Sequence, residues 1–158
     1  MEERLSVPYV FNARTGLQQP AVRTKADVWP AGIVYGTVSD LGQWMIANLN
    51  GGLFKGRRLI GPETFEQVMT RQYDRFAGPI HEGWLNETSG YGLTWWVSMR
   101  NGEKIFAHSG SVNGYTAFLA GNLDRKTGLA VLSNGNRSHR YLFCLALAGL
   151  DLMEEHAR

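Results

Sequence analysis

Hydrophobic residues recur at helical spacing in two stretches of the first half of the chain. The first begins at Thr37, where Asp40 three residues later gives the spacing of a capping box, and it ends at Asn50-Gly51-Gly52. The second begins with Pro62 at a first helical position. The pattern predicts a helical segment over residues 37–72. Its apolar positions are Leu41, Trp44, Met45, Leu49, Phe65, Val68 and Met69.

From Tyr91 onward the apolar positions alternate with a period of two, which is typical of strands. Asn101-Gly102 is a strong two-residue hairpin signal, and a polar loop from Asp124 to Gly128 precedes the last run. In that loop we expect Gly128 to supply a positive φ. The pattern predicts antiparallel strands within residues 91–134, at Tyr91–Met99, Glu103–His108, Tyr115–Leu123 and Leu129–Asn134.

The two ends of the chain differ in character. Residues 1–30 are rich in turn-forming and polar residues without a sustained period, so we expect an irregular lead-in. Residues 138–156 carry apolar side chains around most of a helix circumference, which predicts a C-terminal helix packed against the sheet. This order gives an α+β fold, an antiparallel β-sheet flanked by helices, in a single domain over residues 1–158.

Composition excludes several classes of function. The chain has 16 Lys and Arg against 14 Asp and Glu, with the two signs interspersed, which gives no electrostatic footprint for nucleic acid. The longest apolar stretch, Leu142–Leu150, is too short to span a bilayer, which takes ~20 residues. Cys144 is the single cysteine and the four histidines lack zinc-ligand spacing, so we expect no metal and no other cofactor. No export signal is readable at the start, and the compartment stays open.

The segment His108-Ser109-Gly110-Ser111 is a candidate for chemistry because of its setting. It lies at the end of a predicted strand, just before a turn at Asn113-Gly114. Small residues there would let a substrate approach the backbone, and a free main-chain N–H can stabilise developing negative charge. The alternative is an ordinary polar β-bend without function.

The pair Trp95-Trp96 suggests a platform for stacking a carbohydrate. Consecutive strand residues face opposite sides of a sheet, so the two rings are better explained as core and cover. A carbohydrate-binding domain that uses the five Trp residues is therefore the weakest functional hypothesis.

Four short segments follow one another in a set order along the chain. They are Pro30-Ala31-Gly32 with Ser39-Asp40-Leu41 and Trp44 to Gly52, then Tyr91-Gly92-Leu93-Thr94-Trp95, then His108-Ser109-Gly110 with Asn113-Gly114-Tyr115, and finally Leu129–Asn134. As an ordered set they resemble the C-terminal half of the serine β-lactamase-like hydrolases, the broad family of class C β-lactamases, D,D-peptidases, penicillin-binding proteins and related esterases. The resemblance covers roughly residues 8–155 and implies the C-terminal part of a β-lactamase/transpeptidase-like fold.

The resemblance also implies roles for residues near the predicted turn. In that family a third motif, Lys-Thr-Gly or His-x-Gly on an edge strand, lines the site, and His108-Ser109-Gly110 matches it. His108 would then be a catalytic cationic or hydrogen-bonding residue, and the N–H of Ser111 would be an oxyanion donor. Ser109, Gly110 and Asn113 would contact the substrate. Lys126-Thr127-Gly128 spells the same motif but lies one hairpin too late, where turn chemistry explains it.

Two further motifs of the family are absent from this sequence. Its nucleophile belongs to a Ser-x-x-Lys motif and is activated by a Tyr-x-Asn motif, and neither pattern occurs here, so the resemblance implies that both would lie upstream of Met1. Loss of the nucleophile in another serine hydrolase lowers the rate by on the order of 10⁶, so we expect the chain alone to be inactive.

These observations leave two main hypotheses. The first is the C-terminal portion of a serine hydrolase, which acts on a small amide, ester or peptide substrate once an N-terminal portion completes it. The second is a non-catalytic binding or interaction module of the same fold, with self-association through an uncovered sheet edge or apolar face.

Overall fold

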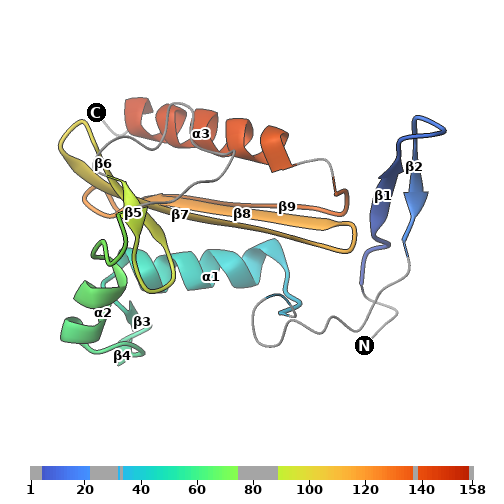
Figure 1. The fold of residues 1–158 in the computed structure, drawn as a ribbon. Helices are drawn as coiled ribbons and strands as arrows, with labels where there is room; N and C mark the ends of the chain where they lie inside the picture. The colour runs from blue at the N-terminus through green and yellow to red at the C-terminus, as the bar shows by residue number, and fades with distance from the viewer. Residues whose placement is uncertain (1–4, 22–31, 33, 75–88, 137–138, 157–158) are drawn as a thin grey trace.

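The computed structural model describes residues 5–21, 32, 34–74, 89–136 and 139–156. Its centre is a five-stranded antiparallel sheet in the order β5-β6-β7-β8-β9, with α1 and α2 on one face and α3 on the other (Figure 1). The strands are β5 (Gly90–Tyr91), β6 (Trp96–Arg100), β7 (Glu103–Val112), β8 (Tyr115–Asn122) and β9 (Thr127–Ser133), and the helices are α1 (Val38–Leu49), α2 (Pro62–Val68) and α3 (His139–His156). The predicted α+β fold with an antiparallel sheet flanked by helices is confirmed.

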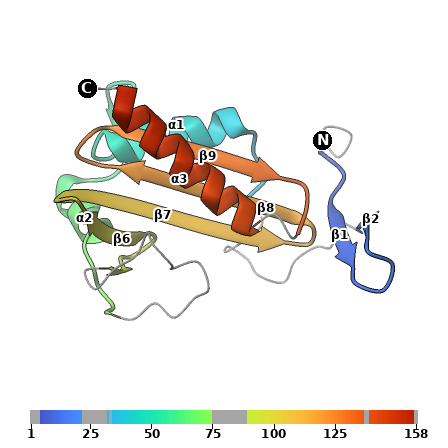
Figure 2. The same ribbon diagram turned by 90° about the horizontal axis from the view of Figure 1, so that it is seen from above.

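The alternation of side chains along β7 and β8 builds two cores. Phe106 belongs to the core shared with α1 and α2, whereas its neighbour Ala107 belongs to the core under α3, which crosses over the strands (Figure 2). Trp95 and Trp96 divide in the same way between the two cores, which confirms that they form no common platform. Each face of the sheet is thus covered by a helix, which buries the apolar side chains of both faces.

The first helix begins and ends at local signals. The predicted capping box is confirmed: the Asp40 amide donates to Thr37 Oγ1 at 3.2 Å, and the Thr37 amide donates to Asp40 Oδ2 at 2.8 Å. The bond from the Thr37 amide, and after it a bond from the Thr37 hydroxyl to Asp40 Oδ2 at 2.8 Å, hold the pKa of the Asp40 carboxyl below its ordinary value. After Asn50, Gly51 and Gly52 adopt φ values of 66° and 81°, which turn the chain out of the helix.

Two hairpins frame β7. Both residues of each turn, Asn101-Gly102 and Asn113-Gly114, have positive φ. This is the conformation of the type I′ turn, whose twist matches that of antiparallel strands. The third hairpin corrects the sequence interpretation, because Lys126, with φ 59°, takes the positive φ expected at Gly128. Gly128 lies within β9 instead, where a Cβ would stand 2.9 Å from Met45 Cε, so its missing side chain lets α1 approach the sheet.

Three further predictions require correction. The lead-in contains a hairpin of β1 (Tyr9–Asn12) and β2 (Leu17–Pro20), and the turn after α1 contains the short pair β3 (Leu53–Phe54) and β4 (Arg57–Arg58). The strand expected at Tyr91–Met99 is broken between β5 and β6, where the Gly92 amide donates to the Trp95 carbonyl at 2.7 Å. From the turn formers Gly78-Pro79, Gly83 and Gly90 we also expect a loop over residues 73–90, and most of it lies outside the described residues.

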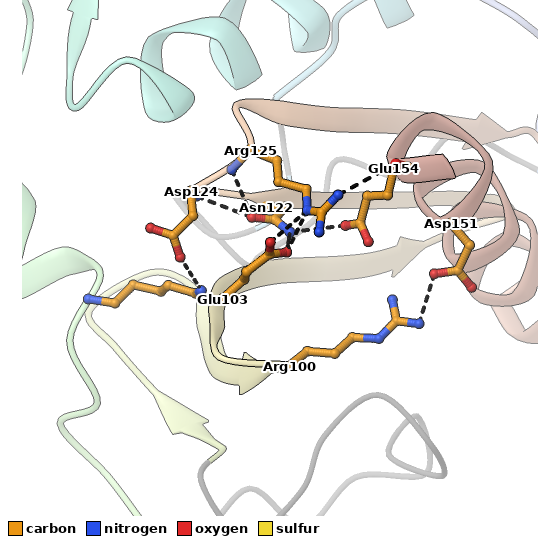
Figure 3. A network of polar contacts seen from close by, with 8 residues as sticks. Arg100, Glu103, Asn122, Asp124, Arg125, Asp151 and Glu154 are labelled. Carbon is orange, nitrogen blue, oxygen red and sulfur yellow. Dashed lines mark hydrogen bonds and ion pairs between the residues drawn. The ribbon is translucent and has the colours of Figure 1, made fainter. Parts of the chain in front are cut away.

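A polar network ties together the end of the sheet opposite the Asn113-Gly114 turn (Figure 3). At its centre the buried Asn122 donates from Nδ2 to Glu103 Oε2 at 2.7 Å and to Glu154 Oε1 at 3.0 Å. Arg125 also binds Glu103, at 2.7 Å, and Arg100 pairs with Asp151 of α3 at 2.8 Å. The network joins both hairpins at this end to the last turns of α3.

No helix in the described part of the chain is long and apolar enough to cross a bilayer.

Candidate functional site

One edge of β7 is open over its second half. β6 pairs with β7 only from Arg100↔Glu103 to Trp96↔Ala107, whereas β8 pairs with it as far as Val112↔Tyr115. In Figure 2, β7 accordingly runs well beyond β6. Along residues 108–112, therefore, no strand in the described part of the chain occupies the side of β7 away from β8. His108, Ser109, Gly110 and Ser111 all lie here, so they are inside a strand rather than at its end as the sequence suggested.

The turns at both ends of β7 determine which amides face this open edge. In a two-residue hairpin the residues flanking the turn exchange hydrogen bonds, and along the ladder the bonded pairs then alternate. Counting from Val112↔Tyr115, the even-numbered residues of β7 bond to β8. Counting from Arg100↔Glu103, the odd-numbered residues bond to β6. The Leu123 amide, which donates to the Lys104 carbonyl at 2.8 Å, agrees with this assignment.

It follows that the N–H and C=O groups of Ser109 and Ser111 point out of the open edge. Both residues are odd-numbered, and β6 ends before it reaches them. Gly110 between them is exposed, and a Cβ built on it would meet nothing within 4 Å. A strand edge with two outward amides and a position without a side chain can hold a polar group close to the backbone.

His108 is held by aromatic rings at this edge. Its ring stacks on Trp96, with centroids 5.1 Å apart and an interplanar angle of 21°, and the Trp95 ring lies edge-on at 6.4 Å. The Tyr91 hydroxyl lies 3.0 Å from His108 Nε2. Residues of β5 and β6, and of the bend between them, therefore fix the ring from three directions.

The half-buried setting of His108 changes its protonation. Burial lowers the pKa of the imidazole, and a hydrogen bond to the backbone of Ser109 acts in the opposite direction. Burial also raises the pKa of the Tyr91 phenol, which stays protonated. Of the two roles that the family resemblance left open for His108, the hydrogen-bonding role therefore fits better than the cationic one.

Ser111 uses its hydroxyl within the fold. The Thr116 hydroxyl donates to the Gly135 carbonyl at 2.8 Å, so the 3.3 Å contact between Ser111 Oγ and Thr116 Oγ1 has Ser111 as donor. What Ser111 offers at the open edge is thus its amide, not a nucleophilic oxygen.

The backbone conformation of the turn explains why Asn is found at position 113. It is exposed and adopts φ 44° at the first position of the type I′ turn, where Asn is favoured. Gly114 has φ 86°, and a Cβ there would lie 2.9 Å from the Tyr9 backbone, so β1 packs directly against the turn. β1 is also bonded to the strand end, by the Tyr9 amide to the Asn134 carbonyl at 2.8 Å. The contact of Asn113 with a substrate stays a prediction.

The structure thus brings together four of the five residues named from the sequence, at one strand edge, and it adds two that sequence reasoning missed. Tyr91 and Trp96 contact the His108 ring, although no role was expected for Tyr91, and Trp95 and Trp96 were expected only as core and cover. Tyr91 does lie within one of the four ordered segments, which was the available signal. No group of three or more His, Cys, Asp or Glu side chains able to hold a metal ion occurs among the described residues.

Comparisons with known proteins identify the family and the fold of the chain. A family model described as beta-lactamase matches residues 2–150. Among solved structures, the octameric penicillin-binding protein homologue from Pyrococcus abyssi is similar to 98% of this chain, with a TM-score of 0.69 and 22% sequence identity. This chain covers 32% of the length of that homologue. No curated protein matches.

Proposed function

The chain belongs to the beta-lactamase family, and on that premise we propose that it forms the C-terminal wall of a serine hydrolase site that cleaves an amide or ester by acyl transfer. The observation that carries the proposal is the open edge of β7, with the amides of Ser109 and Ser111 pointing outward beside His108. An N-terminal portion with the Ser-x-x-Lys and Tyr-x-Asn motifs supplies the nucleophile and its base.

In this reaction the wall acts on the oxygen of the substrate carbonyl. The serine oxygen of the N-terminal portion bonds to the carbonyl carbon, the carbonyl electron pair moves onto oxygen, and the Ser111 N–H donates to that oxyanion. The leaving amine or alcohol departs with the proton taken from the serine, and water then hydrolyses the acyl-enzyme. Loss of one such donor costs about 3 kcal/mol in the barrier. The open position at Gly110 lets the acyl chain lie against the strand.

Two uncovered surfaces support completion by another segment. The outer edge of β9, Thr127–Ser133, has no partner strand among the described residues and carries no charge or proline that would protect an exposed edge. On α3, the large apolar side chains of Tyr141, Leu145 and Leu152 are 57 to 76% exposed, beside the buried stripe that faces the sheet. We propose that the N-terminal portion covers both surfaces with a strand and a helix.

A complementation assay tests the proposal. This chain is mixed with a separately produced N-terminal portion that carries both motifs, and hydrolysis of a chromogenic cephalosporin and of a short-chain nitrophenyl ester is followed. We expect turnover of at least one substrate by the mixture and none by either part. Gly110→Ala should lower that turnover at least tenfold without loss of stability, since its methyl group enters open space at the strand edge. Gly61→Ala, also exposed and with nothing within 4 Å, is the matched control. A mixture without turnover would contradict the proposal.

A second candidate function, an interaction module without catalysis, is favoured by the same exposed apolar stripe on α3. The octameric assembly of the Pyrococcus abyssi homologue is compatible with self-association of this chain. Sedimentation over a range of concentrations, with Leu145→Lys as the variant, tests this candidate. Concentration-dependent association that the variant abolishes would support it, and a monomer that binds no apolar dye would rule it out.

A further inference from the structure

The outer edge of β9 presents hydrogen-bonding groups in an order that follows from the ladder. Counting from the Asn113-Gly114 turn, the odd-numbered residues of β8 bond to β7. The even-numbered residues of β8 therefore bond to β9, and the residues opposite them on β9 are odd-numbered. The residues of β9 whose N–H and C=O groups point out of the sheet are thus Gly128, Ala130 and Leu132.

These outward groups are complementary to a second copy of themselves. When two β9 strands lie antiparallel with Ala130 opposite Ala130, each Gly128 lies opposite the Leu132 of the other copy. All three pairs then join outward-pointing residues, so each pair can exchange two hydrogen bonds. Leu129 and Val131 also lie opposite one another in this register. No charged residue or proline of β9 opposes the contact.

The helix above β9 carries an exposed apolar stripe on the matching side. Asp151 pairs with Arg100 of β6 at 2.8 Å, so that flank of α3 faces β6. With 3.6 residues per turn, Tyr141, Leu145 and Leu152 fall on the opposite flank, toward the outer edge of β9. From Tyr141 to Leu152 the sequence has no charge except Asp151, which is paired. An uncharged edge beside an uncharged flank suits an equally uncharged surface, and a second copy supplies one.

The spacing of the layers brings the two copies of α3 into contact. A two-fold axis perpendicular to the sheet, between the two Ala130 residues, keeps both helices on the same face. Because α3 lies over β8 and β9 (Figure 2) and strands are about 4.8 Å apart, the helix axes would be about 10 Å apart. Packed helices lie about 8 to 10 Å apart. A Cβ on Gly149 would lie 3.5 Å from Leu129, so the middle of the stripe is near the axis and Leu145 faces the other copy's Leu152.

The exposed apolar area is large enough for a stable pair. Tyr141, Leu145, Leu152 and Leu132 are 76, 58, 57 and 40% exposed. At about 200 Å² for a large side chain, they present about 900 Å² in two copies. A stable interface buries about 1,200 to 2,000 Å² in total, and the two strand edges add to the side-chain area.

We propose that this chain by itself forms a two-fold dimer in which the β9 edges pair antiparallel about Ala130 and the α3 helices pack through Leu145 and Leu152. The two five-stranded sheets become one continuous sheet. The dimer rests on the self-association given above as the second candidate function and specifies its interface. It occupies the surfaces that the N-terminal portion would cover, so the dimer must separate before a hydrolase site can be completed.

Disulfide cross-linking tests the register. Ala130→Cys is made together with Cys144→Ser, which removes the one native thiol. Opposite Cα atoms in a bonded antiparallel pair are about 5.5 Å apart, which a disulfide can span. We expect mild oxidation to turn most of this variant into a covalent dimer. Leu132→Cys with Cys144→Ser is the matched control on the same strand and face, and it should stay uncross-linked because its two copies would be about 13 Å apart along the strands.

Hydrogen exchange of the unaltered chain provides a second measurement. The outward amides of Ala130 and Leu132 should exchange at least tenfold more slowly in a concentrated sample than in a dilute one. The amides of Leu129 and Val131 bond to β8 and should exchange slowly in both samples. Exchange of Ala130 and Leu132 that does not depend on concentration would overturn the proposal, even if Ala130→Cys fails to fold.

The outcomes separate this interface from the proposed functions. Equal cross-linking at both positions, or association in sedimentation without cross-linking at Ala130, would overturn the interface and leave self-association standing. A monomer at every concentration would overturn both. Because cross-linking needs no activity, neither result bears on complementation, and failure of complementation would leave the dimer standing.

Discussion

Replacement of Asn122 by Asp should destabilise the fold strongly at neutral pH. Asn122 is 1% exposed, and its Nδ2 donates to a carboxylate on β7 and to another on α3. The change keeps the shape of the side chain and keeps Oδ1, which accepts from the Asp124 and Arg125 amides at 3.1 Å. It replaces only the donor, by an oxygen that faces the Glu103 and Glu154 carboxylates (Figure 3).

The size of the effect follows from the bonds that are lost. A hydrogen bond to a charged group contributes about 1.5 to 3 kcal/mol, and two such bonds disappear. Glu103 is partly exposed, which screens the new repulsion, so we expect a loss of about 4 kcal/mol in the free energy of unfolding. With an m-value of about 2 kcal/mol/M in urea, the unfolding midpoint should fall by about 2 M.

Urea unfolding followed by tryptophan fluorescence measures this midpoint. Nearby carboxylates raise the folded-state pKa of the introduced acid, so the penalty should be complete above that pKa and smaller below the unfolded value of about 3.9, where the protonated acid regains one of the two donors. Asn12→Asp is the matched control, because Asn12 is only half-buried, its Nδ2 donates to the neutral Gln19 rather than to a carboxylate, and its Oδ1 bonds to the Arg14 and Thr15 amides survive the change. A urea midpoint for Asn122→Asp within about 0.3 M of this control would refute the reasoning. Even the lower estimate for two lost hydrogen bonds corresponds to a midpoint shift several times larger.

Two other positions give equally direct expectations. Gly114→Ala places a Cβ 2.9 Å from the Tyr9 backbone at a residue with φ 86°. We expect the free energy of unfolding to fall by about 2 kcal/mol and the amides of β1 to exchange faster with solvent. Unchanged exchange in β1 would contradict the packing of β1 against this turn. Thr37 holds the pKa of Asp40 in the folded chain below its value in the unfolded chain. The cap therefore stabilises the fold fully at pH values above the unfolded-state pKa, and this stabilisation is lost as the pH falls through the folded-state pKa. Asp40→Asn should therefore reduce the loss of stability on acidification, measured by urea unfolding at several pH values, and an unaltered pH dependence would argue against the cap.

Local signals in the sequence were sufficient for the helices and two of the turns. Thr37 and Asp40 mark the start of α1 within four residues of one another, and Asn101-Gly102 carries its own preference for positive φ. Such signals need no knowledge of the rest of the chain. The His108-Ser109-Gly110 motif was likewise visible as letters, and the family resemblance assigned it to a site.

What the sequence did not reveal depends on contacts between distant segments. The break between β5 and β6 arises because Gly92 lies against the Val68 carbonyl, and the β1 hairpin is fixed by bonds to residues near Asn134. The partnership of Tyr91 and His108 requires β6 to end where it does. Strand periodicity says which face a side chain takes but not how far the neighbouring strand extends, so neither the open edge nor the Tyr91 contact could be read from the pattern.

The direction of the β7 amides, on which the proposed site depends, can be tested residue by residue by hydrogen exchange. Gly110 bonds to β8 and should exchange slowly, whereas the Ser109 and Ser111 amides face the open edge and should exchange almost as fast as unstructured ones. Ala107 is the internal control, because its amide points the same way as theirs but meets β6 and should be slow. If Ser109 and Ser111 exchange as slowly as Ala107, the edge is covered in this chain and cannot offer donors to an oxyanion. If they alone are fast, two turns of type I′ at the ends of one strand suffice to aim both amides into the site.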